Sequence, residues 1–321
     1  MSQMTYILFA IPMFFGTMFL EYLLGRKHRR RGRGFAGKDT AASLAMGVGN
    51  VILSFAVKAA SFGLYLWVYQ FRLFDIPETA WWTFPLLVLC EDFCYYWFHR
   101  VHHEVRFFWA AHVNHHSSTH YNLSTALRQS WTTPFTGPLF WAPLALVGFH
   151  PALILVAQTI SLLYQYFLHT ELVPKLGPLE WIFNTPSHHR VHHGRNPEYL
   201  DRNYAGIFII WDRLLGTFEP ERAEVDYGLT KNIQTYNPWT IAFHEWSAMF
   251  KDAWTADGAR NKLGFLLRPP GWLPGGKGAT AKDLRRLAEA QAAEASAAQA
   301  AALEVVKPEA ADAAEAHAAQ A

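Results

Sequence analysis

The fold of this chain is decided by one stretch, EDFCYYWFHRVHHEVRFFWAAHVNHHSSTHYNLSTALRQS, at residues 91–130. This stretch holds seven of the sixteen histidines, and a further group follows at residues 188–193. Residues three or four apart share one face of a helix, so the spacing predicts three histidine faces, written HxxxH, HxxHH and HxxHH. The three faces consist of His99 and His103, of His112, His115 and His116, and of His189, His192 and His193.

These three faces predict a metal centre. Imidazole is the commonest side-chain metal ligand and suits iron, zinc, copper and nickel. Eight imidazoles exceed what one ion takes, since an octahedral metal has about six ligands. They fit two ions with coordination positions left open. A single histidine is more often a satisfied polar residue or a helix cap, but three clusters at helical spacing favour a functional site.

The composition indicates a chain that is not an ordinary soluble protein. Hydrophobic residues make up 51% of its 321 residues and charged residues 17%, whereas soluble domains carry about 25% charged residues. The two cysteines, Cys90 and Cys94, form neither a disulfide framework nor a CxxC motif.

The first apolar segment, residues 6–24, is long enough to cross a membrane. No basic segment precedes it and no small-residue cleavage site follows it, so it is not expected to be a removable signal peptide. A basic run at residues 26–33 comes directly after it. No further basic stripe supports nucleic-acid binding. The run therefore predicts a cytoplasmic loop and an N-terminus outside.

Two further spans are expected before the first histidine face. Residues 41–71 run outward, with Gly47 and Gly49 suited to close helix packing. Residues 81–98 return to the cytoplasmic side. Buried carboxylates in a span are functional candidates by default. Asp92 shares a helical stripe with His99 and His103, so we expect it to accept a hydrogen bond from a ligand imidazole.

The remaining segments are expected to complete the membrane part and to end in a tail. Residues 137–168 are apolar and broken at Gly148, which predicts a helical hairpin that returns to place His169 beside the other histidines. From residue 279 the chain is rich in alanine and glutamate, which favours a loose helix or a disordered, dispensable tail. The predicted regions are membrane helices with the basic loop (1–80), a histidine-box catalytic region with further membrane helices (81–262), and a linker and tail (263–321).

Several strings around the histidines resemble a known family. They are DFCYYWFHR at 92–100, HHSS at 115–118, YNLSTALRQS at 121–130, FLHTE at 167–171 and NTPSHHRVHHGRN at 184–196. Together with the three boxes they resemble the fatty acid hydroxylase/sterol desaturase superfamily, and within it the alkylglycerol monooxygenase branch. The resemblance implies an all-α, polytopic membrane protein with a cytoplasmic, helical di-iron domain.

The resemblance also implies site residues and a reaction. His169 matches an additional histidine of the family, which brings the expected metal ligands to nine, and Glu104 matches an acidic position. The implied activity is O2-dependent hydroxylation of a lipid at two irons, with cleavage of glyceryl ethers and tetrahydrobiopterin or another reduced donor as reductant. Asn122, Arg128 and Gln129 are candidates for holding the lipid head group or the pterin, but they are equally suited to capping and bracing helices.

Other functions are compatible with the same histidines. A fatty acid or sterol hydroxylase or desaturase of the superfamily would use the same irons on another lipid. A zinc hydrolase usually needs only three ligands and a general base. A metal store or transporter would need coordinating residues along the spans, which are sparse apart from Glu91 and Asp92.

Overall fold

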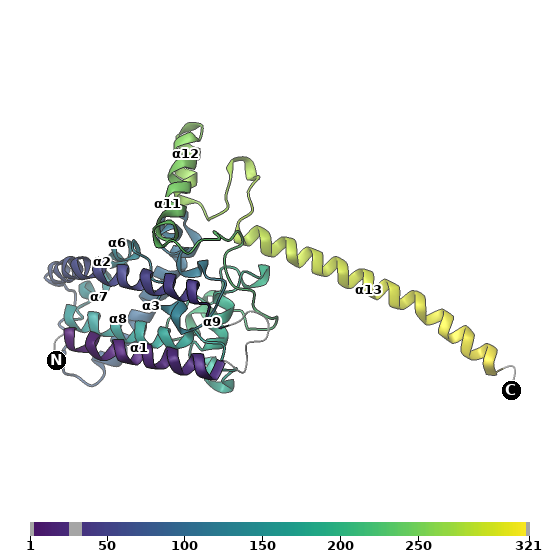
Figure 1. Cartoon of the computed structure of the whole chain (residues 1–321), viewed down its shortest axis with the longest axis horizontal. Helices are drawn as coiled ribbons and strands as arrows, with labels where there is room; N and C mark the ends of the chain where they lie inside the picture. The colour runs from purple at the N-terminus through teal and green to yellow at the C-terminus, as the bar shows by residue number, and fades with distance from the viewer. Residues whose placement is uncertain (1–2, 26–33, 319–321) are drawn as a thin grey trace.

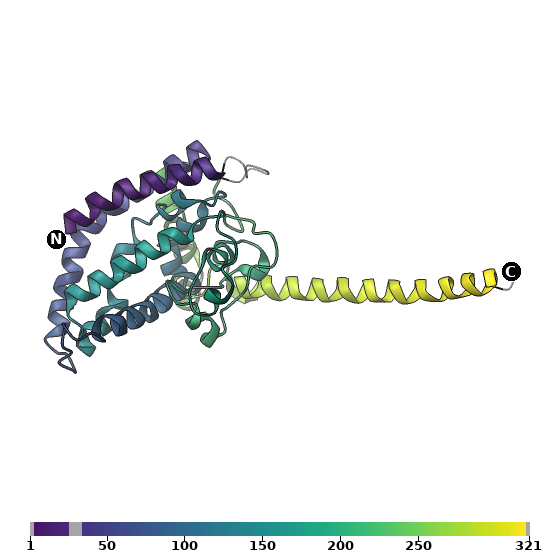
Figure 2. The same ribbon diagram turned by 90° about the horizontal axis from the view of Figure 1, so that it is seen from below.

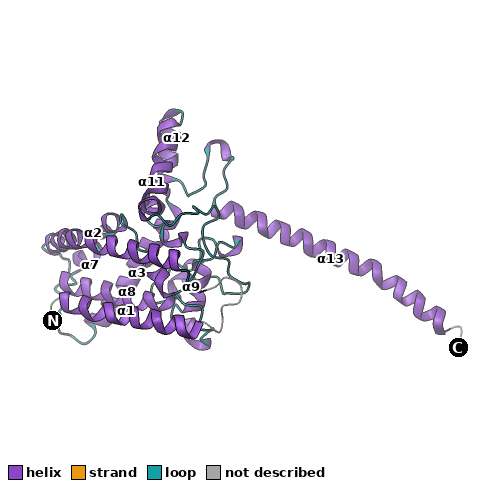
Figure 3. Cartoon of the chain, in the orientation of Figure 1, coloured by secondary structure: helices purple, strands orange, loops and turns teal. Residues whose placement is uncertain are grey.

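The computed structural model describes residues 3–25 and 34–318, and this part of the chain is helical (Figures 1 and 3). It forms no extended strand, only isolated bridges that join Phe183 to Phe208 and Gly194 to Tyr227. The predicted all-α class is therefore confirmed. The basic run at residues 26–33 lies outside the described residues.

Among the described residues, five helices of 18 residues or more precede α12: α1 (Gln3–Gly25), α2 (Gly37–Tyr69), α3 (Thr83–Glu104), α8 (Pro151–Leu168) and α11 (Pro238–Thr255). Shorter α-helices connect them: α4 (Arg106–Ala110), α5 (Leu123–Ala126), α6 (Thr133–Thr136), α7 (Ala142–Val147), α9 (Pro186–His192) and α10 (Ile210–Leu215). The chain continues with the helix α12 (Gly258–Leu267) and the long helix α13 (Ala281–Ala318). The described part of the chain also contains the 3-10 turns η2 (His115–Ser117), η3 (Pro138–Phe140), η4 (Gly177–Trp181), η5 (Pro197–Tyr199) and η6 (Pro274–Gly276).

The helices α1, α2, α3 and α8 run along the body of the molecule (Figures 1 and 2). The turn between α2 and α3 lies at one end. The C-terminal ends of α3 and α8 lie at the other, next to α9 (Figure 1). Because the histidines follow or occupy these C-terminal ends, the bundle brings all three histidine segments to one end of the body.

Aromatic and aliphatic side chains fill the bundle between α2, α3, α7 and α8. Its fully buried members include Tyr65, Leu87 and Ile154. Two glycines of α2 permit close approach: a methyl group added to Gly47 would lie 2.8 Å from the Leu127 carbonyl oxygen, and one added to Gly49 would lie 2.2 Å from the Trp131 ring nitrogen. Both glycines therefore approach the segment that follows α5, and not another long helix.

The outer surface of the bundle is apolar. Exposed large hydrophobic residues occur on all four long helices, with Phe19 on α1, Phe55 on α2 (78% exposed), Phe93 on α3 and Leu162 on α8. Among the described residues, only α8 is by itself long and apolar enough to cross a membrane. Helix α2 would be a second span if its two halves, Gly37–Phe55 and Val57–Tyr69, which are bent by 43°, form one crossing.

The hairpin predicted at residues 137–168 is confirmed in outline. Its first limb is only η3 and α7, and its return limb is the full helix α8. Gly148 makes the break: its φ of 128° is open to glycine, and an added methyl group would meet the Phe74 carbonyl oxygen at 2.1 Å. His150 then caps α8 by accepting a hydrogen bond from the Ala152 amide.

The C-terminal region differs from the predicted linker and tail. Helices α11 and α12 form a pair that projects from the side of the bundle, and residue 263 lies inside α12 (Figure 1). Helix α13 is long and points away from the body over most of its length, while its first turns contact η5 (Figures 1 and 2). The helical option for the tail is the one that the structure adopts.

Candidate metal centre

Helix α3 presents the first histidine face as predicted. His99 and His103 are one turn apart near its C-terminal end, and both are buried. The third face is also helical, because α9 carries His189 and His192, and His193 is its C-terminal cap residue.

The second face is not on an α-helix, which corrects the sequence-based expectation. Helix α4 ends at Ala110, and the chain then turns tightly through His112 into η2, which begins at His115. The turns are closed by hydrogen bonds from the His112 and Val113 amides to the Trp109 carbonyl and from the His115 amide to the His112 carbonyl. This compact path sends His112 and His116 to one group of imidazoles and His115 to another.

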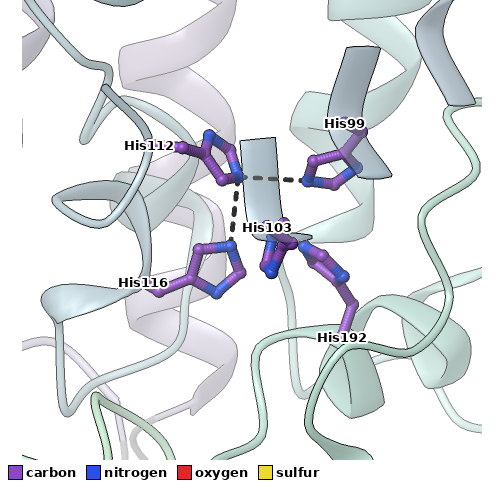
Figure 4. Close-up of side chains that lie close together, drawn as sticks. All are labelled: His99, His103, His112, His116 and His192. Carbon is purple, nitrogen blue, oxygen red and sulfur yellow. Dashed lines mark hydrogen bonds between the residues drawn. The ribbon is translucent and has the colours of Figure 1, made fainter. Parts of the chain in front are cut away.

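The nine predicted ligands lie in two adjacent groups, in each of which the candidate ligand atoms are within 4.8 Å of one another. The first group, called here cluster one, contains His99, His103, His112, His116 and His192 (Figure 4). The second, called cluster two, contains His115, His169, His189 and His193. All nine side chains are buried.

The spacing of the ring nitrogens is that of ligands around a shared ion. In cluster one, the Nε2 atom of His112 lies 3.1 Å from that of His99 and 3.2 Å from that of His116 (Figure 4). In cluster two, the Nε2 atom of His169 lies 3.2 Å from that of His115 and 3.1 Å from that of His189. Two imidazole nitrogens bound at right angles about 2.1 Å from one ion are about 3.0 Å apart.

Burial keeps these imidazoles neutral at physiological pH. It lowers the pKa of His115 to about 4 and that of His192 to about 3. It also lowers the pKa values of His112, His116 and His193 well below the ordinary value, and neighbouring imidazoles lower them further. A neutral imidazole offers the lone pair that a metal needs.

Unpaired ring nitrogens indicate that the clusters are made for a ligand. The Nε2 atoms of His103, His192 and His193 are buried and have no hydrogen-bond partner. A buried unsatisfied polar group costs about 1–3 kcal/mol, so three cost about 3–9 kcal/mol, comparable with the whole stability of a domain at about 5–15 kcal/mol. Metal binding satisfies such atoms, and the residues present therefore fit two metal ions.

One loop, residues 201–204, orients three imidazoles of cluster one from behind. The outer nitrogen (Nδ1) of His99 lies 2.8 Å from the Tyr204 carbonyl oxygen, and that of His192 lies 2.9 Å from the Arg202 carbonyl oxygen. The Nδ1 atom of His103 lies 3.5 Å from the Asp201 carboxylate. Acceptors at Nδ1 place the proton there, which directs the Nε2 lone pairs of His99 and His192 into the cluster.

Nothing in the sequence marks this loop directly. Asp201 lies in a polar stretch rich in turn-forming residues, and backbone carbonyls leave no signature in a sequence. The only available signal was a carboxylate close in sequence to the third histidine face.

Asp92 does not perform the predicted role. Its carboxylate, fully buried, accepts hydrogen bonds from the Ile207 amide at 2.6 Å, the Phe208 amide at 2.9 Å and the Trp211 ring N–H at 3.1 Å. Asp92 lies on the same helical stripe as His99, but the chain segment after the loop donates the hydrogen bonds that its carboxylate accepts. Asp92 therefore anchors residues 207–211, and the Tyr204 carbonyl takes the position next to His99.

Glu104, which matches an acidic position of the family, makes no direct contact with the imidazoles among its hydrogen bonds and ion pairs. Its carboxylate pairs with Arg100 at 2.9 Å and has the Tyr204 hydroxyl at 3.5 Å. The Tyr204 ring in turn contacts His103 at a centroid distance of 5.4 Å. Glu104 thus reaches cluster one only through Tyr204.

The side chains of three further candidates cap and brace the fold, as the second of the two expected roles requires. These candidates are Asn122, Arg128 and Gln129. The Asn122 side chain caps α5 by accepting a hydrogen bond from the Ser124 amide, and the Gln129 amide donates to the Ala126 carbonyl. Arg128, 1% exposed, donates to Asp39 at 3.1 Å and to the Asn114 carbonyl at 3.2 Å. These polar atoms are engaged within the protein, so they are poorly placed to hold a head group or a pterin.

Two neighbouring histidines are distinguished from the nine. His102 places Nδ1 2.7 Å from the Phe98 carbonyl and Nε2 2.8 Å from the Thr136 hydroxyl, so both ring nitrogens are used. His188 points away from the clusters into a pocket of about 280 Å³ that Glu180, Arg213 and Phe218 also line. Neither residue belongs to a metal-binding group.

The helical fold and the two buried histidine clusters define a class: helical proteins with histidine groups able to bind metal. Comparison with known sequences agrees with this class. Residues 84–217 match the model of the fatty acid hydroxylase family. The match begins at the start of α3 and ends just after α10. The matched region therefore contains all nine histidines.

The chain is also similar over most of its length to individual proteins of known activity. The chain is 44% identical to the alkylglycerol monooxygenase of Danio rerio and 43% identical to that of Homo sapiens, in both cases over 84% of this chain. It spans 60% of the length of each of these relatives. It is also 29% identical to an ornithine lipid hydroxylase of Rhizobium tropici, over 61% of this chain and 58% of that relative. No solved structure matches the chain.

Proposed function

We propose that this protein is a membrane-bound, O2-dependent di-iron monooxygenase that hydroxylates and cleaves glyceryl ethers. The observation that carries the proposal is the pair of buried, neutral histidine clusters at one end of an apolar helical bundle. The substrate class rests on the similarity to alkylglycerol monooxygenases.

The ligand set favours two irons. Five imidazoles leave one position of an octahedral ion open, and four leave two. Two irons held there would supply the activation of O2 that oxidation of an unactivated carbon requires. A zinc hydrolase is disfavoured, because such sites use about three protein ligands and a general base for each ion.

The chain's own residues would do three things for this chemistry. The loop at residues 201–204 fixes the imidazole rings. The buried surroundings of the clusters exclude bulk water, which protects an oxidising site from side reactions. The apolar exterior of the bundle holds the clusters next to the lipid that is to be oxidised.

The proposed reaction balances with one external two-electron donor. An ether R–CH2–O–R′, O2, two electrons and two protons give R–CH(OH)–O–R′ and water. This hemiacetal breaks its C–O bond, which yields the aldehyde R–CHO and the alcohol HO–R′, here glycerol or a glycerol derivative. We propose tetrahydrobiopterin or another reduced cytosolic donor as the source of electrons.

The proposed location is a multi-pass arrangement in the inner or plasma membrane, with the histidine clusters on the cytoplasmic side. The apolar exterior of α1, α2, α3 and α8 supports membrane insertion. The sidedness rests on the basic run at residues 26–33, which follows α1 directly in the sequence. Helix α1 itself ends at the end of the bundle where the histidines lie (Figure 1).

Helix α11 supports attachment at the same membrane surface. An aromatic stripe follows its length, formed by Trp239, Phe243, Trp246, Phe250 and Trp254. Trp254 is 85% exposed and Trp239 66% exposed. Exposed tryptophans at helical spacing suit the interface between lipid and water.

We propose three regions, as in the sequence-based division. The boundary at the end of the catalytic region is moved from residue 262 to residue 267, where α12 ends. The regions are the N-terminal helices to residue 80, the catalytic region from 81 to 267, and the C-terminal loop with α13. This division follows from the contacts of α12 with α4, the helix that leads into the second histidine face.

The decisive assay supplies the purified protein, made anaerobically in detergent and loaded with iron, with an alkylglycerol, O2 and tetrahydrobiopterin. The expected products are the fatty aldehyde and glycerol, in step with the O2 consumed. His112→Ala, which removes a central imidazole of cluster one, is the matched inactive control. If no aldehyde forms while a free fatty acid or a sterol is hydroxylated, the ether specificity is wrong and another lipid hydroxylase activity of the family replaces it.

A further inference from the structure

The loop that orients cluster one adopts a backbone that its surroundings must hold. Asp201 has a φ of 53° and Asn203 a φ of 56°, both in the left-handed region. Aspartate and asparagine enter this region more readily than most residues, but two such residues within three positions form a conformation that is sparsely populated without support. The position of the acceptors for His99, His103 and His192 therefore depends on what supports the loop.

The C-terminal half of the loop is supported by the catalytic region itself. The buried Asn203 side chain donates to the His188 carbonyl at 3.1 Å and to the Glu219 carbonyl at 2.7 Å. The Asp212 carboxylate accepts from the Tyr204 and Ala205 amides at 2.8 Å each.

The N-terminal half is supported by a different part of the chain. Leu200, directly before Asp201, has its carbonyl oxygen 2.5 Å from the Nη1 atom of Arg285, which lies in the first turns of α13. Arg285 is partly buried there, and α13 packs against η5, the turn that leads into the loop.

The start of α13 is itself well anchored. The Asp283 carboxylate accepts hydrogen bonds from the Thr280 amide at 3.0 Å and the Thr280 hydroxyl at 2.6 Å, which caps the helix. The Ala279 amide donates to the Gly271 carbonyl at 3.0 Å. Arg285 is thus presented to Leu200 from a fixed helix end, while the remainder of α13 extends away from the body (Figure 1).

We propose that Arg285 is a positioning residue for cluster one: by holding the Leu200 carbonyl, it fixes the loop that orients His99, His103 and His192. This inference rests on the proposed metal site and assigns a role to the beginning of a helix that the sequence alone marks as dispensable.

The test measures binding of Co²⁺ alone to full-length, metal-free protein in detergent, through the visible absorption of the bound ion. All variants carry His169→Ala, which disables cluster two, so that the titration reports on cluster one. Arg285→Ala is compared with Arg286→Ala, the adjacent arginine on the exposed side of α13. Arg285→Lys tests rescue, because an ammonium group can still donate to the carbonyl.

Arg285→Ala is expected to weaken Co²⁺ binding about tenfold, the low end of the range for lost outer-shell partners, and to change the absorption spectrum. Arg285→Lys should recover part of both, and Arg286→Ala should match its parent. If Arg285→Ala does not fold, a shifted spectrum in Arg285→Lys supports the inference and an unchanged one overturns it. Identical binding and spectra in Arg285→Ala and Arg286→Ala overturn the inference alone, whereas a parent protein that binds no Co²⁺ overturns the proposed metal site with it.

Discussion

Two adjacent buried carboxylates of α3, Asp92 and Glu91, should respond very differently to the same isosteric change. Asp92 accepts three hydrogen bonds from the segment that follows the orienting loop, namely from the Ile207 and Phe208 amides and the Trp211 ring. Glu91 accepts one hydrogen bond from the Trp141 ring at 3.1 Å, and its second oxygen has no partner.

Asp92→Asn is expected to destabilise the protein by about 3–5 kcal/mol. The asparagine amide keeps only one acceptor oxygen, so at least one hydrogen bond is lost, which costs about 1.5–3 kcal/mol when the acceptor is charged. A buried N–H group then faces the NH2 group without an acceptor, which costs about 1–3 kcal/mol more. Glu91→Gln keeps the oxygen that Trp141 uses, and its new NH2 group replaces an oxygen without a partner. Its cost should stay below about 1 kcal/mol.

The assay is thermal unfolding of both variants in the same detergent, together with their metal content after loading. In a protein of this size or slightly smaller, each kcal/mol of destabilisation lowers the melting temperature by about 2–4 °C. The melting temperature of Asp92→Asn should therefore lie roughly 5–15 °C below that of Glu91→Gln. It should also bind metal in cluster one more weakly, because residues 207–211 continue the orienting loop. Equal melting temperatures would refute the assignment of Asp92 as the anchor of this segment.

Three further predictions concern charge and topology. Burial lowers the pKa of His115 to about 4 and that of His192 to about 3, so below about pH 6.5 the unfolded chain binds protons that the folded, metal-free protein does not. Its melting temperature should be constant above about pH 7 and fall as the pH drops towards 4, and a flat profile would contradict this. Glu104→Ala should leave the metal content unchanged and lower turnover by less than about tenfold, because it touches cluster one only through Tyr204; loss of metal would show a closer role. In a protein without Cys90 and Cys94, cysteines at positions 38 and 78 should be labelled from opposite sides of the membrane, the first from the cytoplasm, and labelling of both from one side would overturn the proposed topology.

The sequence could indicate which histidines come together, because the chemistry and the spacing of these residues are both visible in it. His99 and His103 require only that α3 be helical through its end, and α9 needs only one turn to bring His189 and His192 together. The division of the second face between the two clusters was not predictable, because it depends on the tight turn from Trp109 to His115 and not on a helical period.

Roles that depend on contacts between distant segments could not be assigned from the sequence. Asp92 lies on the histidine stripe, but which group reaches it is decided by the path of residues 204–211. The acceptors for His99 and His192 are backbone carbonyls, which any residue supplies. Arg285 stands in a region whose composition resembles a tail, and only the return of the chain to η5 gives it a partner.

Whether the nine histidines form two separate metal sites is tested by the metal content of three proteins after anaerobic loading with Fe²⁺ and removal of unbound metal. Two irons per chain are expected in the natural sequence. One is expected in His112→Ala, which lacks the imidazole between His99 and His116, and one in His169→Ala, which lacks the corresponding imidazole of cluster two. One iron per chain in the natural sequence, or no loss in either variant, would contradict two separate metal sites.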